Sequence, residues 1–209
     1  MSQPWTVVVP VKRLSAAKTR LRGGLPGVPH EELALALAAD TLDAVRACTE
    51  VAEVRVVTDD PRVAGAARRV GARVLPDVAG AGLNAAFQHG AIGAAGWVTG
   101  LTADLPALRP VELTAALRAA QAGPPGVRGF VADAPGTGTV LLAAPPGVPL
   151  APRFGPDSAA AHAASGARPL AGDWPSLRRD VDTADDLAAA ARLGLGPRTA
   201  ALAAGCLTG

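Results

Sequence analysis

The sequence predicts an α/β fold with a mostly parallel central sheet and flanking helices. Short runs of β-branched residues, of which Val7, Val8 and Val9 form the first, alternate with longer segments whose apolar residues repeat at helical spacing. The chain has 209 residues, enough for one full hydrophobic core. We therefore expect a single domain spanning residues 1–209.

Strand and helix patterns alternate regularly through the first 121 residues. The predicted strands lie at residues 6–9, 54–58, 72–75 and 97–102, and the predicted helices at residues 31–48, 61–70, 82–87 with the glycine-rich stretch after it, and 110–121. Parallel strands joined by helical crossovers give a Rossmann-like sheet, in which ligands bind beyond the carboxyl ends of the strands.

The pattern changes after residue 123. Prolines and glycines separate short apolar runs at residues 129–133 and 139–143, which predict a small β-rich insertion. A short helix is expected at residues 158–165 with Asp157 or Ser158 as its N-cap, and a strand is expected to end within residues 178–183. Thr183 opens a capping-box pattern for a last helix through Leu193.

The loop after the first strand is strongly basic. It holds Lys12, Arg13, Lys18 and Arg20, and these two lysines are the only ones among the chain's 20 basic residues. Lysine is a common point-charge partner of phosphate oxygens, so its retention in an arginine-rich chain favours a phosphate-binding loop. The alternative is a solvated basic turn.

Composition argues against several classes of partner. Only 3% of residues are aromatic and none is tyrosine, which disfavours stacking on single-stranded nucleic acid, and a net charge of +2 from scattered arginines disfavours duplex binding. The longest uncharged stretch, residues 78–103, holds six glycines and is not apolar enough for a membrane span. Cys48 and Cys206 have no metal-binding or disulfide spacing. We expect a cytoplasmic protein that binds a small anion and neither nucleic acid nor membrane.

Carboxylates follow two of the predicted strands. Asp104 comes directly after the fourth strand and before a proline turn, while Asp180 and Asp182 lie near the end of the chain. Two carboxylate sources together with substrate phosphates are what Mg²⁺ accepts. The alternatives are a helix cap for Asp104 and a turn residue for Asp182. Either Asp180 or Asp182 could supply the second ligand.

A second anion site is suggested by small and hydroxyl residues at 136–139 and 155–158. Either segment alone would more often be a hairpin turn or an ordinary cap. His30, His89 and His162 are too dispersed to predict a triad or a metal cluster, and we interpret all three as structural. Nothing in the sequence predicts an oligomeric state.

Missing motifs narrow the chemistry further. The chain has neither GxxxxGK[ST] nor a GxGxxG after its first strand, which disfavours P-loop enzymes and dinucleotide dehydrogenases. A nucleotidyltransferase remains, in which an acceptor phosphate attacks the α-phosphorus of a nucleoside triphosphate and pyrophosphate leaves. The attacking phosphate dianion needs no general base. Such an enzyme therefore has only to position the two substrates and neutralise the charge of their phosphates.

Seven segments in order, VPVKRLSAAKTRL, VTDD, GLNAAF, LTADLPAL, FVADAPGTGTVLL, RFGPDSAAAHAASGA and DVDTADDL, resemble the guanylyltransferases of coenzyme F420 biosynthesis, which act on 2-phospho-L-lactate or phosphoenolpyruvate. The similarity spans nearly the whole chain and implies the nucleotidyltransferase fold, GTP as donor, Mg²⁺ as cofactor and a three-carbon phosphorylated acid as acceptor. It implies these site residues: Lys12 and Lys18 on the triphosphate, with Asn84 near the nucleoside; Asp104, Asp180 and Asp182 for the metal; and Thr139, Gly155 and Ser158 for the acceptor. The charges of the basic loop add Arg13 and Arg20 to the expected nucleotide contacts. Arg153 is expected to supply charge on the acceptor side, because Thr139, Gly155 and Ser158 cannot.

The chain departs from this family in one segment and leaves other functions open. Relatives often carry a basic residue in the segment that enters the first helix, whereas this chain has Pro29, His30, Glu31 and Glu32 there.

Phosphoenolpyruvate is the favoured acceptor, because the arginine- and alanine-rich composition suggests a GC-rich bacterium and the bacterial branch of the family is associated with this acid. The alternatives are a nucleotide-sugar glycosyltransferase and a catalytically silent nucleotide-binding module.

Overall fold

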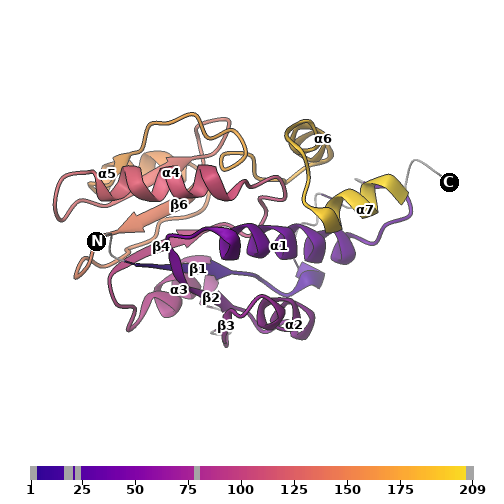
Figure 1. The fold of residues 1–209 in the computed structure, drawn as a ribbon, viewed down its shortest axis with the longest axis horizontal. Helices are drawn as coiled ribbons and strands as arrows, with labels where there is room; N and C mark the ends of the chain where they lie inside the picture. Colours follow the sequence, from indigo (N-terminus) through magenta and orange to yellow (C-terminus); the bar gives the residue numbers. More distant parts are fainter. Residues whose placement is uncertain (1–3, 17–20, 22–24, 78–80, 206–209) are drawn as a thin grey trace.

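The structure, a computed structural model, describes residues 4–16, 21, 25–77 and 81–205. Its centre is a seven-stranded sheet with the order β3-β2-β1-β4-β6-β5-β7, flanked by helices (Figure 1). Four of the neighbouring pairs are parallel, and β6 runs antiparallel to both of its neighbours. The predicted α/β class with a mostly parallel sheet is therefore confirmed.

The elements follow the predicted alternation closely through α4. The strands are β1 Trp5–Pro10, β2 Val51–Val57, β3 Arg73–Leu75, β4 Trp97–Leu101, β5 Gly129–Ala132, β6 Thr139–Ala144 and β7 Arg168–Pro169. The helices are α1 His30–Ala47, α2 Pro61–Arg69, α3 Gly82–Ala91, α4 Pro110–Gln121, α5 Ser158–Ala164, α6 Ala184–Leu193 and α7 Pro197–Gly205, with a 3₁₀ turn, η1, at Leu14–Ala16.

The two faces of the sheet carry separate hydrophobic clusters. Trp5, Val7 and Val9 of β1 pack in one cluster with apolar residues of α1, α2 and α4. Val8 points the other way, into a cluster with Phe87 of α3 and Ala159 of α5. Every residue of β1 is buried, as the uninterrupted apolar run predicts for a strand covered on both faces.

The predicted β-rich insertion is instead part of the central sheet. Strand β6 pairs with β4 on one side and with β5 on the other, and β7 extends the sheet beyond β5. The sequence predicted β5 and β6 but not their place in the sheet, because pairing between strands some forty residues apart leaves no local signal and the Gly- and Pro-rich turns mark only where strands end.

Helix α7 is a second element that sequence periodicity did not reveal. It packs against α1, where the buried carboxylate of Asp40 accepts the backbone N–H groups of Arg198 and Thr199 at 3.1 and 2.8 Å. A carboxylate at a helix N-terminus stabilises it through these hydrogen bonds and the helix dipole. The cap comes from a residue more than 150 positions away, so local sequence could not identify it.

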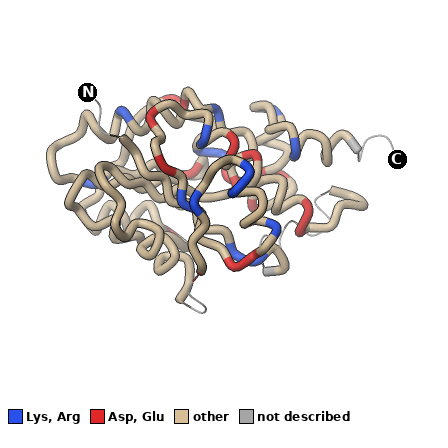
Figure 2. The backbone as a smooth tube through the Cα atoms, turned by 60° about the horizontal axis from the view of Figure 1, so that its bottom comes forward, with Lys and Arg blue, Asp and Glu red and all other residues tan. Residues whose placement is uncertain are grey.

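None of the helices in the described ranges combines the length and hydropathy that a membrane crossing requires. Lys and Arg positions are interspersed with Asp and Glu positions along the chain, mainly over the middle of the molecule in Figure 2.

Candidate active site

The basic loop and the first carboxylate leave the sheet from neighbouring strands. Val8 of β1 pairs with Gly100 of β4, so Lys12 and Asp104 each lie four residues beyond paired positions on parallel strands. The chain turns one way from β1 through β2 to β3 and then resumes on the other side of β1 with β4. The crevice beyond β1 and β4 is thus a topological switch point, where open α/β sheets bind ligands.

Asp60 fastens the beginning of the basic loop. Its Oδ2 accepts the N–H of Leu14 at 3.0 Å, and its Oδ1 caps α2 by accepting from Arg62 and Val63 at 2.9 and 3.3 Å. Burial alone would raise the pKa of the Asp60 carboxyl, but these three backbone donors outweigh it and lower the pKa. The bond from Leu14 joins residues 46 positions apart, so local sequence could not indicate it.

This anchoring leaves the first two cations of the loop in solvent. The side chains of Lys12 and Arg13 are exposed, as a pair that meets a triphosphate must be. Lys18 and Arg20, the other two predicted nucleotide contacts, lie outside the described residues.

Thr41 of α1 forms hydrogen bonds with the two residues that flank Asp104, Ala103 and Leu105. The Thr41 hydroxyl is fully buried, donates to carbonyls that include Ala103 O at 3.1 Å, and accepts the N–H of Leu105 at 3.0 Å. The carbonyl of Asp104 itself accepts the N–H of Val181 at 3.0 Å. That bond brings Asp104 beside the segment that carries Asp180 and Asp182, so the structure unites the two predicted carboxylate sources.

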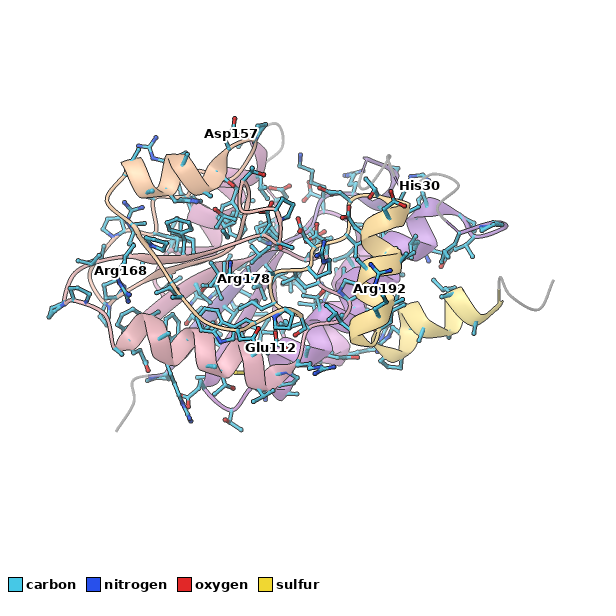
Figure 3. All side chains as sticks on the ribbon, turned by 90° about the horizontal axis from the view of Figure 1, so that it is seen from above. His30, Glu112, Asp157, Arg168, Arg178 and Arg192 are labelled. Carbon is cyan, nitrogen blue, oxygen red and sulfur yellow. The ribbon has the colours of Figure 1, made fainter. Side chains whose placement is uncertain are left out.

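The segment around Asp180 is irregular, not the strand end that the sequence predicts. Side chains hold it in place instead of a strand ladder: Glu112 of α4 accepts the N–H groups of Ser176 and Leu177 at 2.8 and 3.2 Å, and Arg178 donates to Ala132 O at 2.9 Å. Figure 3 shows Glu112 and Arg178 where α4 meets this segment. The predicted capping box of α6 is confirmed between Thr183 and Asp186.

The residue types at this edge are ones that magnesium accepts. Asp104 lies beside the segment of Asp180 and Asp182 through the backbone bond to Val181, and Thr102 adds a buried hydroxyl that has no hydrogen-bond partner within the described chain. Among the residues that the structure describes, no group of three or more His, Cys, Asp or Glu side chains forms a self-sufficient metal cage. Mg²⁺ commonly binds one or two carboxylates together with substrate phosphates and waters, so the smaller set suffices.

The predicted acceptor residues gather near the same edge. Because β6 runs antiparallel to β4, its first residue, Thr139, lies near the carboxyl end of β4, where Thr102 N donates to Val140 O at 3.0 Å. Thr139 and Ser158 are buried, whereas Arg153 is exposed. Gly155 has φ 137°, a conformation that L side chains rarely adopt, which explains glycine there.

Three backbone amides of the predicted second anion site, those of Gly136, Gly138 and Ser158, donate hydrogen bonds within the protein. Asp133 accepts the N–H groups of Gly136 and Gly138 at 2.8 and 2.9 Å, so residues 133–138 form a self-satisfied hairpin turn. Ser158 N donates to Gly155 O at 3.2 Å. The side chains that this part of the site offers a ligand are the hydroxyls of Thr139 and Ser158 and the guanidinium of Arg153.

Asn84 of α3 binds the acceptor loop. Its side-chain amide donates to Phe154 O at 3.0 Å and accepts from Phe154 N at 2.7 Å, while the Phe154 ring stacks on Phe87 with centroids 4.2 Å apart. These contacts fix the residues on either side of Phe154. A contact of Asn84 with the nucleoside stays a prediction.

Two further residues support the acceptor side and were not selected from sequence: the half-buried Arg128 and the buried His162. Arg128 donates to Leu150 O and Ala151 O, both at 3.1 Å, and to Ser165 O at 2.7 Å. His162 of α5 is fully buried and contacts both Thr139 and the backbone of Arg153. The one sequence signal for His162 was its spacing, four residues after Ser158, which places both side chains on the same helix face.

An open cleft of about 510 Å³ lies elsewhere, lined in part by Ile92, Val98 and Pro149. Val98 stands at the amino end of β4, so this cleft opens at the opposite edge of the sheet from Asp104. It is not the candidate site.

Comparison with known proteins shows the family of this chain. The family model described as "Guanylyl transferase CofC like" matches residues 5–147. The chain belongs to this guanylyltransferase family. It is 72% identical to a phosphoenolpyruvate guanylyltransferase of Salinispora arenicola, over 97% of this chain and 94% of that protein, and 56% identical to one of Geodermatophilus obscurus, over 96% and 94%.

Solved structures support the fold of this CofC-like member. A nucleotidyl transferase from Methanothermobacter superposes with a TM-score of 0.64 at 19% identity, covering 91% of this chain and 97% of that one. A cytidylyltransferase from Leptospira borgpetersenii gives a TM-score of 0.57 at 14% identity, covering 87% and 82%. At such identities the similarity concerns the fold, which is that of nucleotidyltransferases.

Proposed function

We propose that this guanylyltransferase joins GTP to phosphoenolpyruvate, with release of pyrophosphate, in the pathway to coenzyme F420. The observation that carries the proposal is that cations after β1, carboxylates after β4 and hydroxyls at the start of β6 meet at one edge of the sheet. The names of the relatives, at up to 72% identity, support the choice of donor and acceptor.

In this reaction an oxygen of the acceptor phosphate attacks the α-phosphorus of GTP. A new phosphorus–oxygen bond forms as the bond to the bridging oxygen of the β-phosphate breaks, and pyrophosphate carries the electron pair away. Lys12, with Lys18 expected beside it, would neutralise the triphosphate, and Arg13 and Arg20 would add charge. Because the attacking oxygen belongs to a phosphate dianion, the site needs no general base.

Magnesium is part of the proposal. Asp104, together with Asp180 or Asp182, would hold the ion, and its chemistry is neutralisation of phosphate charge during the transfer. Thr41 and Val181 keep Asp104 in place for this task through the backbone bonds described above.

The acceptor would occupy the side of the site formed by β6 and α5. Thr139 and Ser158 offer hydroxyl donors to its carboxylate or phosphate oxygens, and Arg153 offers positive charge. Gly155 lets the loop pass close to the ligand because no side chain projects there.

The test is a pyrophosphate-release assay with Mg²⁺, in which GTP, ATP, CTP and UTP are each combined with phosphoenolpyruvate and with 2-phospho-L-lactate. We expect pyrophosphate from GTP with phosphoenolpyruvate, and none when the acid is omitted. A clear preference for phospholactate would refute the acceptor. Absence of pyrophosphate from every pair, or transfer from a nucleotide sugar with release of nucleoside diphosphate, would refute the function.

A further inference from the structure

His162 lies at the junction of the segments assigned to the acceptor. It belongs to α5, one turn beyond Ser158, and its exposed fraction is 0%. Asp157, labelled in Figure 3, marks the beginning of this helix. The imidazole ring connects the two elements that bear the acceptor residues, because one nitrogen contacts β6 and the other contacts the loop of residues 153–158.

The two contacts determine which ring nitrogen carries the proton. Nε2 lies 2.9 Å from the backbone N of Arg153, whose N–H can only donate, so Nε2 must be an unprotonated acceptor. Burial is the main cause that lowers the pKa of His162 to about 4, and the positive charges of Arg128 and Arg153 lower it further. A hydrogen bond with the backbone of Ser158 raises the pKa, but by less than these effects lower it. A neutral imidazole with a bare Nε2 carries its proton on Nδ1.

This tautomer orients the hydroxyl of Thr139. Nδ1 lies 2.9 Å from Thr139 Oγ1, so His162 donates and Thr139 accepts. The hydroxyl proton of Thr139 must then point away from the ring. Within the described part of the chain, the imidazole is the one hydrogen-bond partner of this hydroxyl. Carboxylate and phosphate oxygens are acceptors only, so a hydroxyl held as a donor suits an anionic acid.

The same ring also fixes the start of the acceptor loop. Its Nε2 holds the amide of Arg153, while Phe154 packs edge-on against the imidazole with centroids 5.2 Å apart. A histidine kept only for packing would not require both nitrogens to join the two halves of one site.

We propose that His162 is a positioning residue for the acceptor: its Nδ1–H sets the Thr139 hydroxyl as a donor to the phosphorylated acid, and its Nε2 holds the backbone of Arg153. The inference rests on the proposed function for the identity of that acid. It adds a role that sequence interpretation had given to no histidine in this chain.

Two matched variants separate the two hydrogen bonds. In His162→Gln the longer amide reaches the place of Nε2 and keeps an acceptor for Arg153 N–H, but it leaves Thr139 without its donor. In His162→Asn the shorter amide stays near the place of Nδ1 and keeps a donor to Thr139. His89→Gln, on α3, controls for loss of an imidazole elsewhere.

For His162→Gln we expect the KM for phosphoenolpyruvate to rise about tenfold, the loss typical of one hydrogen bond to a charged ligand. The KM for GTP should change little, and His89→Gln should resemble the native protein. His162→Asn keeps the donor to Thr139 but loses the acceptor for Arg153 N–H, so its KM for the acid should lie between those of His162→Gln and the native protein. Because His162 acts through Thr139, adding His162→Gln to Thr139→Val should have little further effect. Additive losses in that double variant, or equal losses for GTP and the acid, would overturn the proposal.

A binding and a spectroscopic measurement keep this inference separable from the proposed function. If the native protein releases no pyrophosphate, the function fails, while calorimetric titration of phosphoenolpyruvate with Mg²⁺ still compares the native protein with the variants. Absence of binding to the native protein would overturn the positioning role as well. Nitrogen-resolved NMR of the chain's three histidines should show His162 protonated at Nδ1 and bare at Nε2; the opposite tautomer would overturn it even if a variant fails to fold.

Discussion

Thr41→Val removes one buried hydroxyl and keeps the shape of the side chain. The change deletes the acceptor of the Leu105 N–H and the one hydroxyl proton that Leu37 O at 2.8 Å and Ala103 O at 3.1 Å share; Ala103 and Leu105 stand on either side of Asp104. Leu105 and Thr41 are both fully buried, so water cannot replace these partners without rearrangement. Valine and threonine have similar helix propensities, and α1 itself should persist.

The expected loss of stability follows from the lost hydrogen-bond acceptor and the lost hydrogen-bond donor. An orphaned buried N–H costs about 1–3 kcal/mol and the lost bond to the carbonyl about 1 kcal/mol, so Thr41→Val should lower the free energy of unfolding by about 2–4 kcal/mol. Thr41→Ser is the matched control, since it keeps the hydroxyl and loses only a buried methyl group, worth about 1 kcal/mol.

Urea unfolding followed by tryptophan fluorescence measures both variants, because Trp5 and Trp174 are buried in the native protein. Pyrophosphate release by folded Thr41→Val should also fall, since Asp104 is no longer held from both sides, and Thr41→Ser should stay near the native rate. If Thr41→Val is no less stable than Thr41→Ser, the hydroxyl does not hold the segment as described.

Three more predictions concern the donor side of the site. Asp104→Asn removes a negative charge at nearly constant size, so activity should drop and be only partly restored by raised Mg²⁺, and full activity at limiting Mg²⁺ would show that Asp104 is no ligand. Lys18→Ala should slow pyrophosphate release by about a hundredfold with the fold intact, as expected for one lost contact that strengthens in the transition state; a near-native rate would remove Lys18 from the site. Asp60→Ala should destabilise the protein most near neutral pH: because the folded-state pKa is lowered, the carboxylate stabilises the fold above its ordinary pKa and loses that effect as pH falls through the lowered one. Urea unfolding at several pH values should show the gap to the native protein narrowing below about pH 4, and a constant gap would contradict this linkage.

Sequence alone determined the features that depend on local pattern. The apolar run of β1, the helical repeats of α1, α2 and α4, and the capping box at Thr183 each depend on a few neighbouring residues, because backbone geometry repeats every two or 3.6 positions. The rule that parallel strands end at one edge then sufficed to bring Lys12 near Asp104.

Tertiary structure decided what depends on partners distant along the chain. The place of β6 between β4 and β5, the hold of Thr41 on the residues around Asp104, and the cap that Asp40 supplies to α7 all join segments separated by tens of residues. The tautomer of His162 belongs to the same class, since it depends on an amide and a hydroxyl that only folding brings to the two sides of the ring. A residue's type states which hydrogen bonds it can make, and the folded chain selects which of them it does make.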